Sequence, residues 1–175
     1  MSDTTPAPQE DQPQPGVFRV VNQYIKDLSF ENPNAPISVQ GTGKPDIALE
    51  VNLGARGLGE DFPMGKDFYE AELSISATAK EKDSDTVIYV VETNYAGLFQ
   101  IQNVPQQHIG GVLLVDCPTL LFPFARQVVA DAVRNGGFTP LMLEPMDFAG
   151  MYRQKVAQEQ IAAAQNGTSP ETGNA

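Results

Sequence analysis

The sequence predicts an α+β fold built on an antiparallel sheet, and three observations support this prediction. Residues 46–53 and 68–80 alternate polar and apolar side chains, as strands with one buried face do. Residues 86–101 are β-branched and aromatic on both faces, which is typical of a strand covered on both sides. The apolar positions after residue 104 follow helical spacing instead. Strands therefore come first and helices follow, the order of an α+β protein.

The first predicted strand, residues 17–30, separates an apolar face from an acidic one. One set of alternating positions contains Tyr24, Leu28 and Phe30, and the other contains Asp27, Ser29 and Glu31. Because successive side chains of a strand point to opposite faces, the two sets are expected on opposite sides of the sheet. Pro33 and Pro36 then force an extended, non-helical backbone, so the strand is expected to end before them.

The next elements follow from alternation and from turn residues. The apolar side of the strand predicted over residues 46–53 consists of Ile47, Leu49, Val51 and Leu53. A glycine-rich stretch over residues 54–66 predicts a mobile loop, and the charged residues 81–85 predict a turn.

The helical half is marked by its ends. Pro105 and Pro118 suit first-turn positions, where a missing N–H costs nothing. Pro123 predicts a bend near the start of the main helix, and Gly136 suits the position just after its end. Asp147 suits the N-cap of a final helix.

Composition predicts one domain, residues 17–164, between two disordered tails. Residues 1–16 and 165–175 are rich in polar residues and proline and cannot bury enough apolar area to offset the entropy of ordering. The net charge of −11 argues against nucleic acid and anionic membranes as partners, since both attract basic surfaces. The chain has no basic, apolar leader and no run of about 18 apolar residues, and it has a single cysteine. We therefore expect a cytoplasmic protein that does not insert into membranes.

An almost uncharged segment predicts self-association. Between residues 93 and 125 the only formal charge is Asp116. Large uncharged surfaces usually mark interfaces, so we expect a homo-oligomer whose interface uses this region. The candidate interface positions are Val91, Thr93, Tyr95 and Cys117.

Little in the sequence indicates catalysis. His108 is the only histidine and has no nucleophile motif beside it, and Cys117 lies in an apolar stretch next to a carboxylate that disfavours a thiolate. The glycines of residues 54–59 lack the Lys-Ser or Lys-Thr pair of a phosphate loop, so no cofactor is expected. One enzymatic alternative stays open: a small oligomeric α+β enzyme acting on an acyl-type ligand through Asp116, His108 or Cys117. Another alternative is a purely structural adaptor.

Several spaced motifs in the right order resemble SecB, the cytosolic chaperone of bacterial protein export. The matching segments are residues 24–31, 33–36, 95–99, 117–126 and 145–148. The resemblance implies a four-stranded antiparallel sheet with the C-terminal helices packed on one side. It also implies a homotetramer, a dimer of dimers, that binds unfolded precursor proteins, keeps them translocation-competent and delivers them to the ATPase SecA without using nucleotide itself.

The resemblance also assigns roles to residues. The family's SecA-contacting acids lie on the outward sheet face and correspond here to Asp27, Glu31 and Glu92, with Val90 as an apolar neighbour. Its peptide grooves are apolar and lie between a long strand-crossing loop and a helix. The matching candidates for unfolded-peptide binding are Leu28, Phe30, Leu49, Val51 and Leu53. The residues alone favour an ordinary core for these five, and it is the resemblance that favours peptide binding.

Overall fold

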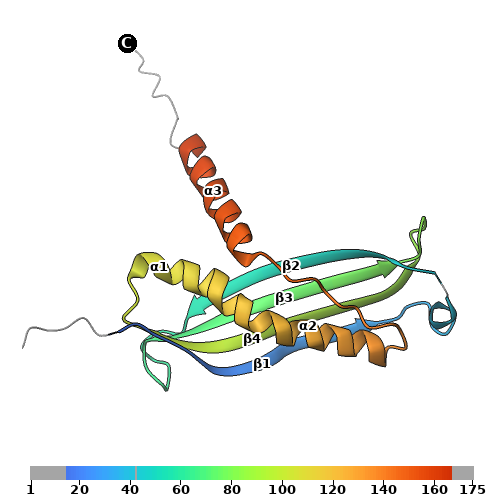
Figure 1. The fold of residues 1–175 in the computed structure, drawn as a ribbon, viewed down its shortest axis with the longest axis horizontal. Helices are drawn as coiled ribbons and strands as arrows, with labels where there is room; N and C mark the ends of the chain where they lie inside the picture. The colour runs from blue at the N-terminus through green and yellow to red at the C-terminus, as the bar shows by residue number, and fades with distance from the viewer. Residues whose placement is uncertain (1–14, 42, 167–175) are drawn as a thin grey trace, which may run out of the picture.

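A four-stranded antiparallel sheet with helices over one face forms the body of the protein (Figure 1), in a computed structural model that describes residues 15–41 and 43–166. The strands are β1 (Val17–Glu31), β2 (Asp46–Gly57), β3 (Phe68–Lys80) and β4 (Val87–Gln102). Their order in the sheet is β1-β4-β3-β2, so β1 and β2 form its two edges. The predicted fold class is confirmed.

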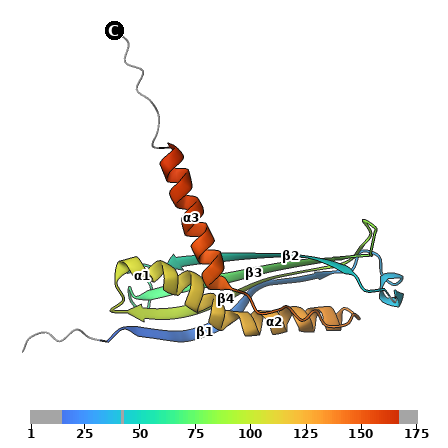
Figure 2. The ribbon, with the colours of Figure 1, turned by 45° about the horizontal axis from the view of Figure 1, so that its top comes forward.

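Apart from one short 3-10 turn between β1 and β2, the helices follow the strands. The helical elements are η1 (Ser38–Gln40), α1 (Gln106–Gly111), the π-helical turn η2 (Val112–Asp116), α2 (Cys117–Asn135) and α3 (Phe148–Asn166). α1, η2 and α2 run on from one another, and α2 crosses β4 and β3. α3 points away from the sheet (Figure 2). Its first turn is capped as predicted, because the Asp147 carboxylate accepts a hydrogen bond from the Gly150 N–H at 2.8 Å.

The core lies between the sheet and α2. The odd-numbered residues of β3 and β4 supply one side of it, and a helical stripe on α2 supplies the other. The largest fully buried side chains are Phe99, Leu73, Ile75, Leu121, Val91, Val129, Val133 and Cys117. A Cβ at Gly97 would lie 2.8 Å from the Leu121 side chain, so glycine lets α2 approach β4 closely. We call this side of the sheet the helix face and the opposite side the outer face.

Some element boundaries differ from the sequence-based expectations. β2 continues to Gly57, four residues beyond the predicted end, because every residue of this stretch pairs with β3. At the end of α2, Gly136 keeps a right-handed backbone and Gly137 takes the positive φ of +92°. Of the predicted tails, residues 1–14 and 167–175 lie outside the described residues, and Gln165 and Asn166 belong to α3.

The alternation predicted for β1 is wrong at Tyr24. Register shifts fall between Val20 and Asn22 and again between Ile25 and Asp27, so Lys26 is an extra, bulged residue. A bulge reverses the facing of everything before it relative to everything after it. Tyr24 therefore lies on the outer face together with Asp27, whereas the prediction placed the two on opposite faces.

The helical stretch Gln106–Asn135 is long and apolar enough, by length and composition, to cross a membrane. In the structure, apolar side chains of this stretch pack against the sheet. Leu121, Ala125, Val129 and Val133 are buried against the sheet. The apolar stripe of this helix is thus part of the core.

Candidate functional site

The acids that the resemblance singled out lie together on the outer face. β1 pairs with β4 so that Ser29 faces Glu92 and Glu31 faces Val90. Glu92 therefore lies between Asp27 and Glu31 on the neighbouring strand. All three carboxylates are exposed. We call Asp27, Glu31 and Glu92 the acidic patch, with Val90 as its apolar member.

The acidic patch is not neutralised by its surroundings. Across residues 15–41 and 43–166, no lysine or arginine lies within ion-pair distance of Asp27, Glu31 or Glu92. Among the described residues, the one side-chain hydrogen bond to these carboxylates comes from the Ser76 hydroxyl, which donates to Glu92 at 3.0 Å. The patch thus offers negative charge and free acceptor oxygens to a basic partner.

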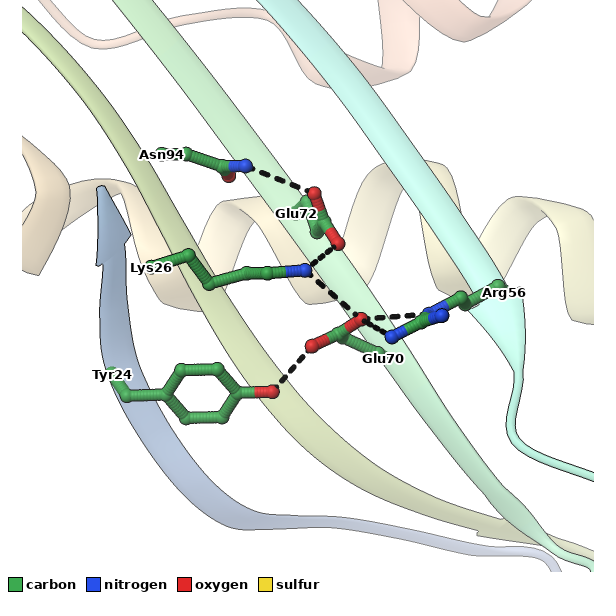
Figure 3. A network of polar contacts seen from close by, with 6 residues as sticks. All are labelled: Tyr24, Lys26, Arg56, Glu70, Glu72 and Asn94. Carbon is green, nitrogen blue, oxygen red and sulfur yellow. Dashed lines mark hydrogen bonds and ion pairs between the residues drawn. The ribbon is translucent and has the colours of Figure 1, made fainter.

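A second polar cluster lies beside the patch and has the opposite character. Figure 3 shows six side chains joined across all four strands, and we call them the outer network: Tyr24, Lys26, Arg56, Glu70, Glu72 and Asn94. The Tyr24 hydroxyl donates to Glu70 at 2.5 Å, and Arg56 pairs with the same carboxylate at 2.7 Å. Lys26 pairs with Glu70 at 3.3 Å and more closely with Glu72. Asn94 donates to Glu72 at 3.0 Å.

The centre of the outer network is Glu70, which is only 5% exposed. Burial by itself raises the pKa of a carboxyl group, but the hydrogen bonds from Tyr24, Arg56 and Lys26 outweigh burial here. They lower the pKa of Glu70 to about 2. Glu70 is therefore ionised at neutral pH, and two cations balance the two carboxylates of the network. The outer face thus has a neutralised half and an acidic half.

The outer network also covers part of β4. Tyr24 and Glu72 flank Ala96 from the two neighbouring strands, and Ala96 is fully buried. Its small side chain leaves room for Tyr24 to reach Glu70 across the strand. Side chains of the same sheet therefore cover this side of β4 at this point.

The five candidates for peptide binding do not form one groove. They share the helix face, but Leu28 and Phe30 lie on β1 whereas the other three lie on β2, the opposite edge. Three strand spacings of nearly 5 Å separate the two edges. The five candidates therefore form two separate apolar sites and not one, because β4 and β3 lie between β1 and β2 in the sheet.

The β2 site contains a real pocket. A cavity of about 230 Å³ is lined by Val51, Asn52, Leu53, Leu114, Met151, Tyr152 and Lys155. β2, η2 and α3 thus contribute one wall each. Leu49 lies further along β2 and is 42% exposed. Leu49, Val51 and Leu53 together form an apolar strip, the β2 strip, beside the edge of β2 that no described strand pairs with.

The β1 site is more mixed. Phe30 packs into an aromatic cluster, with ring centroids 5.6 Å from Tyr89 and 6.3 Å from Phe138. Leu28 is 44% exposed. Phe30 thus mainly belongs to the core, while Leu28 is open to a partner.

The four predicted interface residues are wrong as direct contacts of a second subunit. Val91 and Cys117 have no exposed surface in the single chain, and Thr93 and Tyr95 are buried as well. They lie on the helix face of β4 or at the start of α2, so the chain's own helix covers them. Part of the uncharged stretch belongs to the core, and its exposed large apolar side chains are Leu120 and Phe124 on α2.

The candidate catalytic residues have no arrangement that suits catalysis. Burial, with the nearby Asp116 carboxylate, raises the pKa of the Cys117 thiol to about 12, so the thiol stays protonated. His108 is exposed on α1, and its ring nitrogen Nε2 lies 3.5 Å from the Gln107 amide nitrogen. Within the part of the chain that the structure describes, no group of three or more His, Cys, Asp or Glu side chains could hold a metal ion.

Sequence reasoning missed the outer network, although one signal was present. Tyr24 and Ile25 are adjacent large residues, and the apolar residues Ile25 and Leu28 are three positions apart, which breaks the period of two. Such a phase change indicates a bulge, and a bulge would have placed Tyr24 beside the acids. The partners on β3 could not be predicted, because they depend on the strand order.

Comparisons with known proteins agree on one family. The family model described as "Preprotein translocase subunit SecB" matches residues 9–159. A protein-export protein SecB from Afipia carboxidovorans is 49% identical over 160 residues, which cover 91% of this chain and 94% of that protein. The one from Bradyrhizobium diazoefficiens is 44% identical over 166 residues, 94% of this chain and 93% of that protein.

A solved structure shows the same fold at low sequence identity. It is the SecB-like chaperone of Mycobacterium tuberculosis in complex with a ChAD peptide from the HigA1 antitoxin. The TM-score is 0.59 at 15% identity, over 74% of this chain and 91% of that chain.

Proposed function

This chain belongs to the SecB family of protein-export chaperones, and we propose that it binds unfolded precursor proteins, keeps them translocation-competent without ATP and delivers them to SecA. Its relatives are not enzymes, and the buried, protonated Cys117 agrees with that. We place the activity in the cytoplasm. Neither nucleic acid nor insertion into a membrane has a part in it.

The observation that carries the proposal is the division of the sheet. An unneutralised acidic patch occupies the outer face at β1 and β4, and open apolar side chains occupy the helix face at both edges. One surface suits a basic protein partner and the other suits an unfolded chain. Two ligands can therefore be held at once.

Precursor binding would use the β2 strip first. Leu49, Val51 and Leu53 point to the helix face beside the outer edge of β2, an edge that no described strand pairs with. A free edge can hold an extended chain by backbone hydrogen bonds, while pockets between side chains add preference. The bound peptide of the mycobacterial SecB-like chaperone supports peptide binding by this fold.

SecA docking would use the acidic patch. The net charge of −11 favours approach of a basic surface, and the free carboxylates of Asp27, Glu31 and Glu92 suit charge-assisted contacts. Val90, which pairs with Glu31 at one end of the patch, adds an apolar contact. The attraction between exposed charges is expected to weaken with salt.

We also propose a homotetramer, a dimer of dimers. The exposed apolar side chains that assembly would cover are Phe18 and Ile25 on β1 and Leu120 and Phe124 on α2. Their burial would be favourable at roughly 25 cal/mol per Å² of apolar area. These residues replace the four interface positions predicted from the sequence.

The test is suppression of aggregation of a denatured precursor. Wild type should suppress it at a stoichiometric ratio, equally with and without ATP. Leu49→Asp should weaken this activity, because it puts a charge in the apolar strip. Ala48→Asp is the matched control, because Ala48 is adjacent to Leu49 but pairs with Thr78 and points to the outer face.

Two outcomes would contradict the proposal. Activity at a strongly substoichiometric ratio would favour an enzyme, and lack of any affinity for denatured chains would favour a structural adaptor. An equal loss of aggregation suppression in Leu49→Asp and Ala48→Asp would show that the β2 strip does not bind the precursor.

A further inference from the structure

A second cavity lies between α2 and the residues that lead into α3, and neither precursor binding nor SecA docking uses it. The chain runs back along α2 before α3 begins (Figure 1). The cavity has a volume of about 250 Å³ and is lined by Thr119, Phe122, Pro123, Arg126, Pro145, Met146 and Phe148. Five of these seven residues are apolar, and Arg126 is the only charged one among them. We call this cavity the Arg126 pocket.

The apolar walls of the Arg126 pocket are held in place by the fold. Phe122 and Phe148 are nearly buried, and their rings meet edge to face with centroids 5.8 Å apart. Phe148 is the first residue of α3, and the Asp147 carboxylate caps that helix through the Gly150 N–H at 2.8 Å. The pocket is therefore formed before any ligand arrives, as small-molecule sites usually are.

Arg126 has an unused binding capacity in this pocket. Its side chain is half-buried, and its Nε is buried without a hydrogen-bond acceptor among the described residues. Within residues 15–41 and 43–166, no Asp or Glu lies within ion-pair distance of Arg126. Asp147, the acid next to the lining residue Met146, accepts from Gly150 and lies 3.8 Å from Arg153. A ligand that brings an acceptor to Arg126 would therefore satisfy a donor whose burial is otherwise unfavourable.

The chemistry of the walls selects the kind of ligand. A guanidinium group presents a planar fork of N–H donors that matches the two oxygens of a carboxylate. The apolar walls formed by Phe122, Met146 and Phe148 suit an apolar body attached to that carboxylate. A phosphate dianion fits less well, because the lining residues offer one cation only. The pocket thus suits a ligand with one negative charge and one apolar part.

We infer that the Arg126 pocket binds a small monocarboxylate with an apolar body of about the size of one aromatic ring. The carboxylate pairs with the Arg126 guanidinium, and the apolar body lies against Phe122, Met146 and Phe148. This inference does not depend on the proposed export function, because the pocket shares no residue with the β2 strip or the acidic patch.

The first test uses three ligands on the unaltered full-length protein, with its arginines labelled with nitrogen-15. Titration with 3-phenylpropanoate should shift the Nε resonance of Arg126 in a saturable manner. The neutral analogue 3-phenylpropanamide should bind at least about tenfold more weakly, because it lacks the charge-assisted hydrogen bonds. Acetate should also bind at least about tenfold more weakly, because it has no apolar body to bury.

Variants then assign the binding to Arg126. Arg126→Met should weaken binding of 3-phenylpropanoate by about tenfold or more, because it removes the charge and the donors. Arg126→Lys keeps the charge without the planar fork and should give an intermediate loss. Arg134→Met is the matched control. It removes the same charge from the same helix, but Arg134 is exposed and pairs with Asp131 at 2.6 Å, so binding should stay as in wild type.

Several results would overturn the inference. These are the lack of a saturable Arg126 shift, equal binding of the acid and its amide, and an equal loss of binding in Arg126→Met and Arg134→Met. An Arg126 resonance that follows protein concentration and ignores the ligand would show that a second copy of the chain fills the pocket, which also contradicts it. The three-ligand series needs no variant, so it decides the matter even if Arg126→Met does not fold. Failure of the protein to bind precursors or SecA would overturn the proposed function and leave this inference standing.

Discussion

The two faces of the sheet are built from the same strands but are held by different forces. On β3, Leu73 is fully buried under α2, while its neighbour Ser74 points to the outer face. The helix face is stabilised by apolar burial, which depends on volume and shape. The outer face is stabilised by paired charges around Glu70, which depend on register. Changes on the two faces should therefore have separable effects on stability and on docking.

The largest difference is expected from neighbouring residues on opposite faces. Leu73→Ala should lower the free energy of unfolding by about 2 to 5 kcal/mol, because it leaves a cavity between β3 and α2. Ser74→Ala should change it by no more than about 0.5 kcal/mol. Denaturant unfolding of both variants measures the contrast. Similar losses would mean that the two faces are not held differently.

Glu70 should give an intermediate effect that depends on pH. Its pKa is lowered from 4.5 to about 2, so its stabilising effect is complete above pH 4.5 and is lost as the pH falls toward 2. Glu70→Gln should therefore flatten the decline of stability in this acidic window. At neutral pH the variant should cost on the order of 1 to 3 kcal/mol, because Arg56, Lys26 and Tyr24 lose a charged partner.

Melting curves between pH 2 and pH 7 test this prediction. Glu92→Gln serves as the comparison at neutral pH, because it removes an exposed carboxylate of the same face and should cost no more than about 0.5 kcal/mol. An acid-induced decline in Glu70→Gln as steep as in wild type would show that other groups cause it.

Local pattern predicted the elements whose structure is local. The bounds of β3 agree with the alternation of residues 68–80, because a strand with one buried face shows its period directly in the sequence. The face predicted for Tyr24 was wrong, because strict alternation leaves no place for the extra residue of a bulge.

Sequence patterns also could not distinguish core residues from interface residues. Cys117 and Val91 look the same whether a helix of the same chain or a second subunit covers them, since both bury apolar surface. The outer network needs the order β1-β4-β3-β2, which brings Lys26 and Glu72 within reach of each other across 46 residues of sequence. Asp27 and Glu31 were placed on the correct face because both follow the bulge.

The central claim, that docking and precursor capture use opposite faces, has one direct test. Asp27→Lys with Glu31→Lys reverses two exposed charges of the acidic patch. Asp46→Lys with Glu50→Lys is the matched control, because it makes the same change of charge on the outer face of β2, at the other edge. Each protein is titrated with SecA and, separately, with a denatured precursor. We predict that only the patch variant loses SecA docking and that both capture precursor as wild type does. Equal loss of both activities in the patch variant, loss of neither, or an equal loss of docking in the control would contradict the account.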